Sequence, residues 1–141
     1  MQAIILAAGR GLRLNKLTEN NTKCMVEING ITLIERMLKQ FCNHDLQRIV
    51  IVDGYQKENL ESFVNTLHID TEIVYVFNKD YLETNNIYSL YLASDYLKAN
   101  DSIIIESDII FENKILDELI SNSNRNIAVI DKYKHWMTGQ G

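Results

Sequence analysis

The chain begins with a short apolar run, Gln2–Leu6, followed at once by a loop of small residues and then by basic side chains. The small residues are Ala7, Ala8, Gly9 and Gly11, and the basic residues are Arg13 and Lys23. Glycine tolerates the positive φ angles that such a loop needs, and consecutive backbone N–H groups can bind phosphate oxygens. Fixed cations stabilise a polyphosphate whose charge grows during a reaction. Together these residues indicate a site for a nucleoside triphosphate.

Asp108 follows the apolar run Ile103–Ile105, with Glu106 between them. A carboxylate just beyond a buried parallel strand is well placed to hold Mg²⁺, which takes one or two carboxylates together with phosphate oxygens. The alternative is a turn or helix-capping aspartate, because a helix is expected a few residues later. The N-terminal loop favours the metal, and we expect Glu106 to support the site or the fold around it.

A polar segment, Thr84, Asn85 and Asn86, precedes a predicted helix, and Ser89 lies one turn into that helix. As an N-cap, Asn or Thr has a sufficient structural role. The amides could equally pair with the donors and acceptors of a nucleobase edge. Both interpretations can hold together, since a helix N-terminus also attracts anions.

Three further residues, Tyr133, His135 and Trp136, cluster late in the chain. They are either loop residues that pack on the flank of the domain, or an aromatic pair able to hold a quaternary ammonium group by cation–π contact.

Apolar runs of strand length alternate with segments of helical period. The expected extended segments are Gln2–Leu6, Met25–Ile28, Arg48–Val52, Glu72–Phe77, Ile103–Ile105 and Ile127–Ile130, and the expected helices are Ile31–Phe41, Glu58–Leu67, Asn86–Leu97 and Ile115–Ile120. The apolar side of the third helix is assigned to Ile87, Leu90, Tyr91 and Tyr96 or Leu97. This alternation predicts an α/β fold with a mostly parallel sheet and helices on both faces. Ligands bind at the carboxyl ends of such strands, where the glycine loop, Asp53-Gly54 and Asp108 all fall.

Length and composition limit the classes of protein to consider. With 141 residues the chain is about one domain, and its net charge of −5 disfavours nonspecific binding to nucleic acid. No apolar run approaches the ~18 residues of a membrane span, and the N-terminus lacks the pattern of a signal peptide. Two isolated cysteines indicate neither a disulfide framework nor a zinc site. We therefore expect a cytoplasmic protein with no nucleic-acid or membrane partner.

The N-terminal motifs resemble those of the sugar-phosphate nucleotidyltransferases. The resemblance rests on LAAGRGLRL at residues 6–14, Leu17-Thr18, Lys23, the run Val26 to Gly30, and Leu33-Ile34-Glu35. Within that family, Asn78, Tyr81 and the run Thr84 to Leu90 look like the bacterial phosphocholine cytidylyltransferases. The segment Glu106 to Phe111 is similar to relatives that use 2-aminoethylphosphonate.

The resemblance implies a Rossmann-like nucleotidyltransferase fold and a reaction without a covalent enzyme intermediate. An acceptor phosphate or phosphonate, such as phosphocholine, attacks the α-phosphorus of a nucleoside triphosphate, with CTP favoured, and pyrophosphate is released. By the same resemblance Arg13 neutralises the β- and γ-phosphates, Lys23 stabilises the α-phosphate, and Asp108 holds Mg²⁺. The residues implied to contact the nucleotide are Leu6, Ala7, Ala8, Gly9, Gly11, Asn85, Asn86 and Ser89.

The chain departs from the family pattern in two respects. Lys16 and Thr22 stand where the family usually has proline, and the family commonly supplies a second metal-binding aspartate well beyond residue 141. We therefore expect residues 1–141 to be the nucleotide-binding, N-terminal part of a longer domain. The alternatives are a sugar-1-phosphate nucleotidyltransferase and a non-catalytic nucleotide-binding fragment. A dinucleotide-binding domain would need a third glycine where Leu14 stands.

Overall fold

The structure is a computed structural model that describes residues 1–11, 21–124, 126–130 and 132. It divides into two compact units, Met1–Ile110 and Phe111–Gly141. The first unit contains a four-stranded parallel sheet in the order β5-β4-β1-β6. Its strands are β1 (Gln2–Leu6), β4 (Arg48–Asp53), β5 (Glu72–Phe77) and β6 (Ser102–Glu106). Among the described residues of the second unit there is one helix, α5 (Asn113–Ser121).

The strand order reverses at β1. The chain adds β4 and then β5 on one side of β1, and it returns to place β6 on the other side. Ligands of open α/β sheets bind at such a reversal, beyond the carboxyl ends of the two strands that flank it. The residues that follow β1 and β6 are therefore those that the topology favours for a site.

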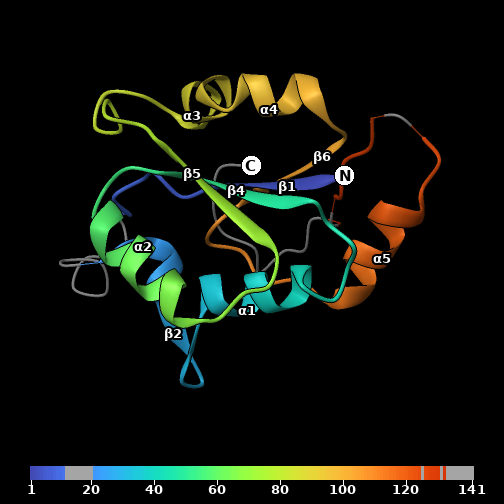
Figure 1. Cartoon of the computed structure of the whole chain (residues 1–141), viewed down its shortest axis with the longest axis horizontal. Helices are drawn as coiled ribbons and strands as arrows, with labels where there is room; N and C mark the ends of the chain where they lie inside the picture. The colour runs from blue at the N-terminus through green and yellow to red at the C-terminus, as the bar shows by residue number, and fades with distance from the viewer. Residues whose placement is uncertain (12–20, 125, 131, 133–141) are drawn as a thin grey trace. The chain divides into compact units, whose positions relative to one another are not determined.

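Helices cover both faces of this sheet, as the sequence predicted (Figure 1). α1 (Leu33–Phe41) and α2 (Lys57–Thr66) lie on one face, and α3 (Asn86–Leu92) and α4 (Ser94–Ala99) lie on the other. The sheet residues that face α3 and α4 form a buried cluster with Ala93, between the two helices. The sheet members of this cluster are Ile4, Leu6, Val50 and Val52.

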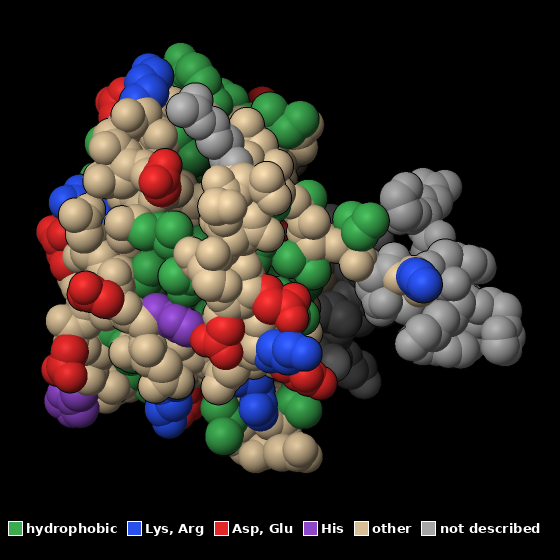
Figure 2. All heavy atoms as spheres, turned by 90° about the vertical axis from the view of Figure 1, so that its right-hand side faces the viewer, with side chains coloured by type: hydrophobic (Ala, Val, Ile, Leu, Met, Phe, Trp, Pro, Cys, Tyr) green, Lys and Arg blue, Asp and Glu red, His purple; other side chains and the backbone are tan. Residues whose placement is uncertain are grey.

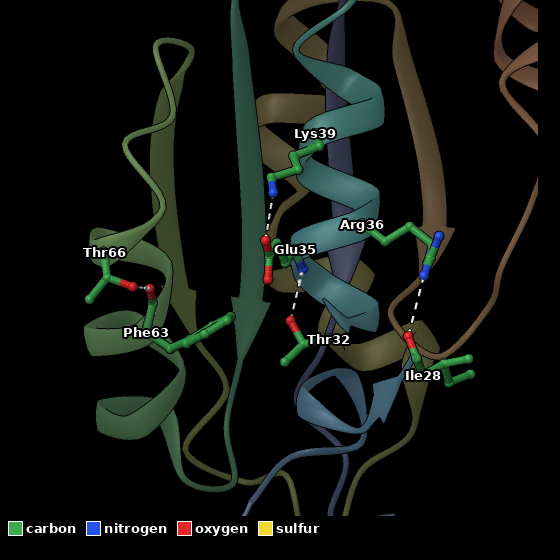
Figure 3. Close-up of polar contacts among 7 residues, drawn as sticks. All are labelled: Ile28, Thr32, Glu35, Arg36, Lys39, Phe63 and Thr66. Carbon is green, nitrogen blue, oxygen red and sulfur yellow. Dashed lines mark hydrogen bonds and ion pairs between the residues drawn. The ribbon is translucent and has the colours of Figure 1, made fainter. Parts of the chain in front are cut away.

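A short hairpin precedes α1 and shortens the helix predicted from residue 31. β2 (Glu27–Ile28) pairs with β3 (Ile31–Thr32) around Asn29 and Gly30, whose φ angles of 55° and 76° are the positive values that a tight two-residue hairpin needs. Thr32 then caps α1 by accepting a hydrogen bond from the Glu35 amide at 3.1 Å (Figure 3). The apolar spacing in residues 31–41 correctly predicted a helix, but the helix begins at Leu33, after its N-cap Thr32, rather than at residue 31.

The predicted third helix is in fact two helices, and part of its assigned apolar side was wrong. Ile87 and Tyr91 are 77% and 67% exposed, whereas Leu90, Tyr96 and Leu97 do pack on the core. The side of α3 that faces the sheet is marked by Ser89 and by Ala93, the residue that follows the helix, which lie four positions apart and are 3% and 0% exposed. Residues two positions from them fall about 200° around the helix and so point away from the sheet.

The predicted strand at Ile127–Ile130 is also wrong. Among residues 126–130, all of which the structure describes, no strand is formed. Val129 and Ile130 are 57% and 89% exposed. Their β-branched side chains favour extended backbone, but a strand also needs a partner for its N–H and C=O groups. The β-propensity of this segment therefore led to the prediction of a strand that is not formed.

The described surface carries charges of both signs. On the face shown in Figure 2, Lys and Arg side chains lie among Asp and Glu side chains rather than in one patch. Within the described ranges, no helix is long and apolar enough to cross a membrane.

Candidate active site at the carboxyl ends of β1 and β6

The loop after β1 is held by backbone hydrogen bonds to both neighbouring strand exits. The Ala7 amide donates to the Val52 carbonyl at 2.8 Å, and the Ala8 carbonyl accepts from the Tyr55 amide at 3.1 Å. On the other side the Leu6 carbonyl accepts from the Ser107 amide at 3.2 Å. Leu6, Ala7 and Ala8, three of the residues predicted to contact the nucleotide, are thus buried and held by backbone hydrogen bonds. Gly9, the next residue, is exposed.

The glycines of the loop differ in what they require. Gly11 has a φ of 67°, in the left-handed region that favours glycine. Gly9 has open space on the side where a Cβ would lie, with no heavy atom within 4 Å. This space is on the loop that the sequence predicts to face phosphates. Arg13, the next predicted site residue, lies outside the described residues.

Lys23 and Asp108, far apart in the chain, form an ion pair beside this loop. Lys23 begins η2, a 3-10 helix that spans Lys23–Met25, and its Nζ lies 3.0 Å from Asp108 Oδ2. Both side chains are 37% exposed, so the pair is reachable from solvent. The structure therefore brings together the cation and the carboxylate that the sequence assigned to one site.

A second polar contact spans the same edge of the sheet. Asn86 Nδ2 donates to Glu106 Oε1 at 2.7 Å, which ties the start of α3 to the end of β6. Burial, followed by the nearby charge of Asp108, raises the pKa of Glu106. Two acidic side chains and the Lys23 ammonium thus meet at the end of β6.

The donor chemistry at this point fits Mg²⁺. No group of three or more His, Cys, Asp or Glu side chains able to hold a metal occurs among the described residues. Mg²⁺ does not require one, because it is usually bound through one or two carboxylates and completes its shell with waters and substrate phosphates. Asp108, a partly exposed carboxylate beside a loop suited to phosphates, meets that requirement.

The other predicted nucleotide contacts have structural roles in the described part of the chain. Asn85 is the N-cap of α3, and its Oδ1 accepts from the amides of Ile87 and Tyr88 at 3.1 and 3.3 Å. Ser89 is buried and accepts a hydrogen bond from Asn78 Nδ2 at 3.1 Å. The capping interpretation is therefore confirmed, and contact with a nucleobase stays a prediction.

Asp53, at the end of β4, is a buried carboxyl group with an unusual environment. It is 0% exposed, and neither oxygen has a hydrogen-bond donor among the described residues unless a proton is shared with the Glu61 carboxyl. Burial first, and then the hydrogen bond and charge of Glu61, raise the pKa of Asp53 to about 7. Lys57 partly offsets this shift, and Glu58 adds to it. The sequence indicated Asp53-Gly54 as one of three candidate features at the strand ends, but it did not predict this buried environment.

A shallow pocket of about 280 Å³ opens beside Asp53, at the carboxyl ends of β4 and β5, and not at the Lys23–Asp108 pair. Its lining includes Tyr55, Lys57, Phe77 and Tyr81. Cations already lie over two of these rings: Arg10 over Tyr55 at 5.1 Å and Lys57 over Phe77 at 5.0 Å. Sequence reasoning missed this aromatic group, because its members come from two segments that lie about twenty residues apart in the chain. The late cluster Tyr133, His135 and Trp136 lies outside the described residues.

The fold and the strand-end site define a nucleotidyltransferase-type α/β domain, and comparison with known proteins agrees. Residues 3–138 match the MobA-like NTP transferase domain, so the chain belongs to that family. It is 33% identical over 141 residues to the choline-phosphate cytidylyltransferase of Streptococcus pneumoniae, covering 100% of this chain and 59% of the relative. It is 36% identical over 112 residues to the 2-aminoethylphosphonate cytidylyltransferase of Lancefieldella rimae, covering 79% and 44%.

Solved structures show the same relationship. The CTP:phosphocholine cytidylyltransferase of Streptococcus pneumoniae superposes with a TM-score of 0.69 at 38% identity, over 79% of this chain and 47% of that one. The chain thus spans about half the length of the relatives that it matches. The Rossmann-like fold expected from the N-terminal motifs is confirmed.

Proposed function

We propose that this chain is the nucleotide-binding, N-terminal part of a Mg²⁺-dependent cytidylyltransferase. The reaction transfers CMP from CTP to a small phosphorylated or phosphonate acceptor, such as phosphocholine, and releases pyrophosphate. The proposal rests on one observation, the ion pair between Lys23 and Asp108, in which Nζ lies 3.0 Å from Oδ2. This pair lies beside the glycine loop, at the point where the strand order reverses. That arrangement offers a cation, a metal-binding carboxylate and backbone donors to one triphosphate.

In this proposal the residues of the site position the reacting phosphoryl groups and stabilise the charge that develops on them. An acceptor oxygen forms a bond to the α-phosphorus while the bond to the pyrophosphate oxygen breaks, so negative charge grows on the phosphoryl oxygens. In this proposal the Lys23 ammonium stabilises that charge, and the backbone N–H groups of the loop from Ala7 to Leu12 bind the phosphates and the base. Arg13 neutralises the departing β- and γ-phosphates. Mg²⁺, which Asp108 would hold, supplies further polarisation of the phosphoryl oxygens.

The choice of base and acceptor is supported by the relatives rather than by geometry. The similar proteins include cytidylyltransferases named for choline-phosphate and for 2-aminoethylphosphonate. A third, from Campylobacter jejuni, is named for phosphoglutamine and is 31% identical over 137 residues. What these acceptors share is a small phosphoryl or phosphonyl group, and we propose that class for this protein.

The proposal is tested by CMP transfer in the protein at its natural length, with CTP, Mg²⁺ and either phosphocholine or 2-aminoethylphosphonate. Lys23→Ala and Asp108→Ala should each lower the rate by at least about a hundredfold, as loss of one stabilising group at a charged transition state does. Lys39→Ala, which removes an exposed lysine paired with Glu35 on α1, is the matched control and should keep the rate. Retention of transfer in both site variants would contradict the proposal. Transfer of UMP or dTMP to a hexose phosphate instead would identify a sugar-1-phosphate enzyme.

A further inference from the structure

A carboxylate and an amide, which the proposed mechanism does not use, are hydrogen-bonded to each other at the edge of the candidate site. Asn86 Nδ2 donates to Glu106 Oε1 at 2.7 Å. Glu106 is the last residue of β6 and is in register with Leu6, the last residue of β1. The pair therefore lies beside the start of the glycine loop, and Asp108 follows Glu106 two residues along the chain.

The sheet register explains why these two side chains meet. Successive side chains of a strand point to opposite faces, and residues in register on parallel neighbours point to the same face. Leu6 belongs to the cluster that faces α3 and α4, so Glu106 points to that face as well. Asn86 is the first residue of α3, on the same side of the sheet. The contact therefore joins the start of α3 to the end of β6.

Hydrogen-bond chemistry decides which atoms this pair offers to a ligand. A carboxylate only accepts hydrogen bonds, so the NH₂ group of Asn86 faces Glu106 and the Asn86 Oδ1 atom faces away from it. Among the described residues, neither that Oδ1 nor Glu106 Oε2 takes part in a hydrogen bond. Asn86 is exposed, and Glu106 is half-buried with its Oε2 in contact with solvent. The pair thus presents two acceptors, one of them charged, to a ligand that carries hydroxyl donors.

The part of a nucleotide that can reach this pair is the ribose. In the proposed function the α-phosphate lies at Lys23 and Asp108, and the ribose is the group joined directly to that phosphate, whereas the base lies one group further away. The 2′- and 3′-hydroxyls of ribose are adjacent donors that match two neighbouring acceptors. A carboxylate near a strand end is also the group that binds ribose hydroxyls in dinucleotide-binding domains.

We propose that Glu106 and Asn86 bind the ribose hydroxyls and so select a ribonucleoside triphosphate over its deoxy analogues. Glu106 accepts a hydrogen bond from one hydroxyl through Oε2. Asn86 holds the carboxylate in place through its Nδ2 and offers Oδ1 to the second hydroxyl. The inference rests on the proposed function, because it takes the position of the α-phosphate from Lys23 and Asp108.

The test compares the affinities for CTP, 2′-deoxy-CTP and 3′-deoxy-CTP, measured by calorimetry with Mg²⁺ on the protein at its natural length. The wild type should bind CTP about tenfold to a hundredfold more tightly than at least one deoxy analogue, the scale of a hydrogen bond to a charged acceptor. Glu106→Ala should abolish this preference by weakening CTP binding to the level of that analogue. Glu106→Gln, which keeps the size but removes the charge, should keep part of the preference.

Two further variants complete the comparison. Asn86→Ala, at an exposed residue, should lower the preference about threefold to tenfold, and it carries the same test if Glu106→Ala does not fold. Glu72→Ala is the matched control. It removes a carboxylate at the start of β5, the opposite end of a strand from the site, where Glu72 pairs with Arg48 at 3.3 Å. This control should leave the preference unchanged.

The comparison separates ribose recognition from a merely structural role. If Glu106 only supported the fold, Glu106→Ala would weaken CTP and both analogues equally and the preference would remain, which would overturn the inference. A wild type that binds CTP and both analogues alike would also overturn it and leave the proposed function standing. Unchanged nucleotide affinities in Glu106→Ala, with weaker binding of phosphocholine, would assign the pair to the acceptor instead. Absence of binding by all three nucleotides would overturn the proposed function itself, and this inference with it.

Discussion

Gly54 packs directly on Ala8, so the loop after β4 touches the loop after β1 backbone to backbone. A Cβ placed on Gly54 would lie 2.7 Å from the Ala8 carbonyl oxygen, 3.0 Å from the Ala8 Cβ and 2.8 Å from the Tyr81 Cβ. None of these atoms belongs to a flexible side-chain end. The position of the candidate phosphate loop therefore depends on the absence of a side chain at residue 54.

Gly54→Ala should destabilise the fold and weaken nucleotide binding together. The added methyl must displace the Ala8 backbone or Tyr81, and overpacking of this kind costs about 1–3 kcal/mol. Denaturant unfolding measures the loss of stability, and calorimetric titration with CTP measures the affinity. Gly9→Ala is the stability control, because a Cβ at residue 9 meets no heavy atom within 4 Å. Equal stability of the two variants would contradict the close approach at residue 54.

Asp53 makes the stability of the protein depend on pH near neutrality. Its pKa is raised from 3.8 to about 7 in the fold, chiefly by burial and then by Glu61. Between these values the folded state binds more protons than the unfolded state, so the free energy of unfolding falls as pH rises and levels off above about pH 7. Asp53→Asn, neutral at every pH, should flatten this slope and be more stable than the wild type at pH 8.

The measurement for Asp53 is denaturant unfolding at pH 5, 6, 7 and 8. Asp45→Asn provides the matched control, because Asp45 is exposed. A slope that persists unchanged in Asp53→Asn, or a stability that rises with pH in the wild type over this range, would show that Asp53 is not the group responsible.

Substitutions at Asn85 can separate its role as the N-cap of α3 from a role in recognising the nucleobase. Asn85→Ala removes the acceptor for the amides of Ile87 and Tyr88 and should cost about 1 kcal/mol of unfolding free energy. Asn85→Ser keeps a capping acceptor and removes the amide donor without adding charge, so it should keep the stability. If the side chain also pairs with the base, Asn85→Ser lowers CTP affinity in a calorimetric titration while the melting temperature holds. Unchanged affinity would restrict Asn85 to the cap.

The elements that carry the site could largely be predicted from the sequence, for physical reasons. β1 is a continuous apolar run because it is buried on both faces, and its end at a glycine loop is a local signal. The helical spacing of five apolar residues similarly predicted α1, and all five are buried: Leu33, Ile34, Met37, Leu38 and Phe41. The carboxylate of Asp108 follows β6 at the sheet edge where β1 also ends, and Lys23 reaches it from η2.

What the sequence did not predict depends on contacts between distant segments. The buried side of α3 is set by the small residues Ser89 and Ala93, so the hydrophobic Ile87 and Tyr91 misled the prediction. The shift of Asp53 likewise requires Glu61 on α2. No local pattern encodes these pairs.

We propose that the Lys23–Asp108 pair and the glycine loop form a site for CTP with Mg²⁺. The most direct test is calorimetric titration of this chain with CTP, UTP, dTTP, GTP and ATP, with and without Mg²⁺, in the wild type and in Lys23→Ala. We expect binding that is selective for CTP, strengthened by Mg²⁺ and weakened at least about tenfold by Lys23→Ala, because that change removes a charge-assisted contact to phosphate. Absence of binding by any of the five nucleotides, or binding that Lys23→Ala leaves unchanged, would contradict it.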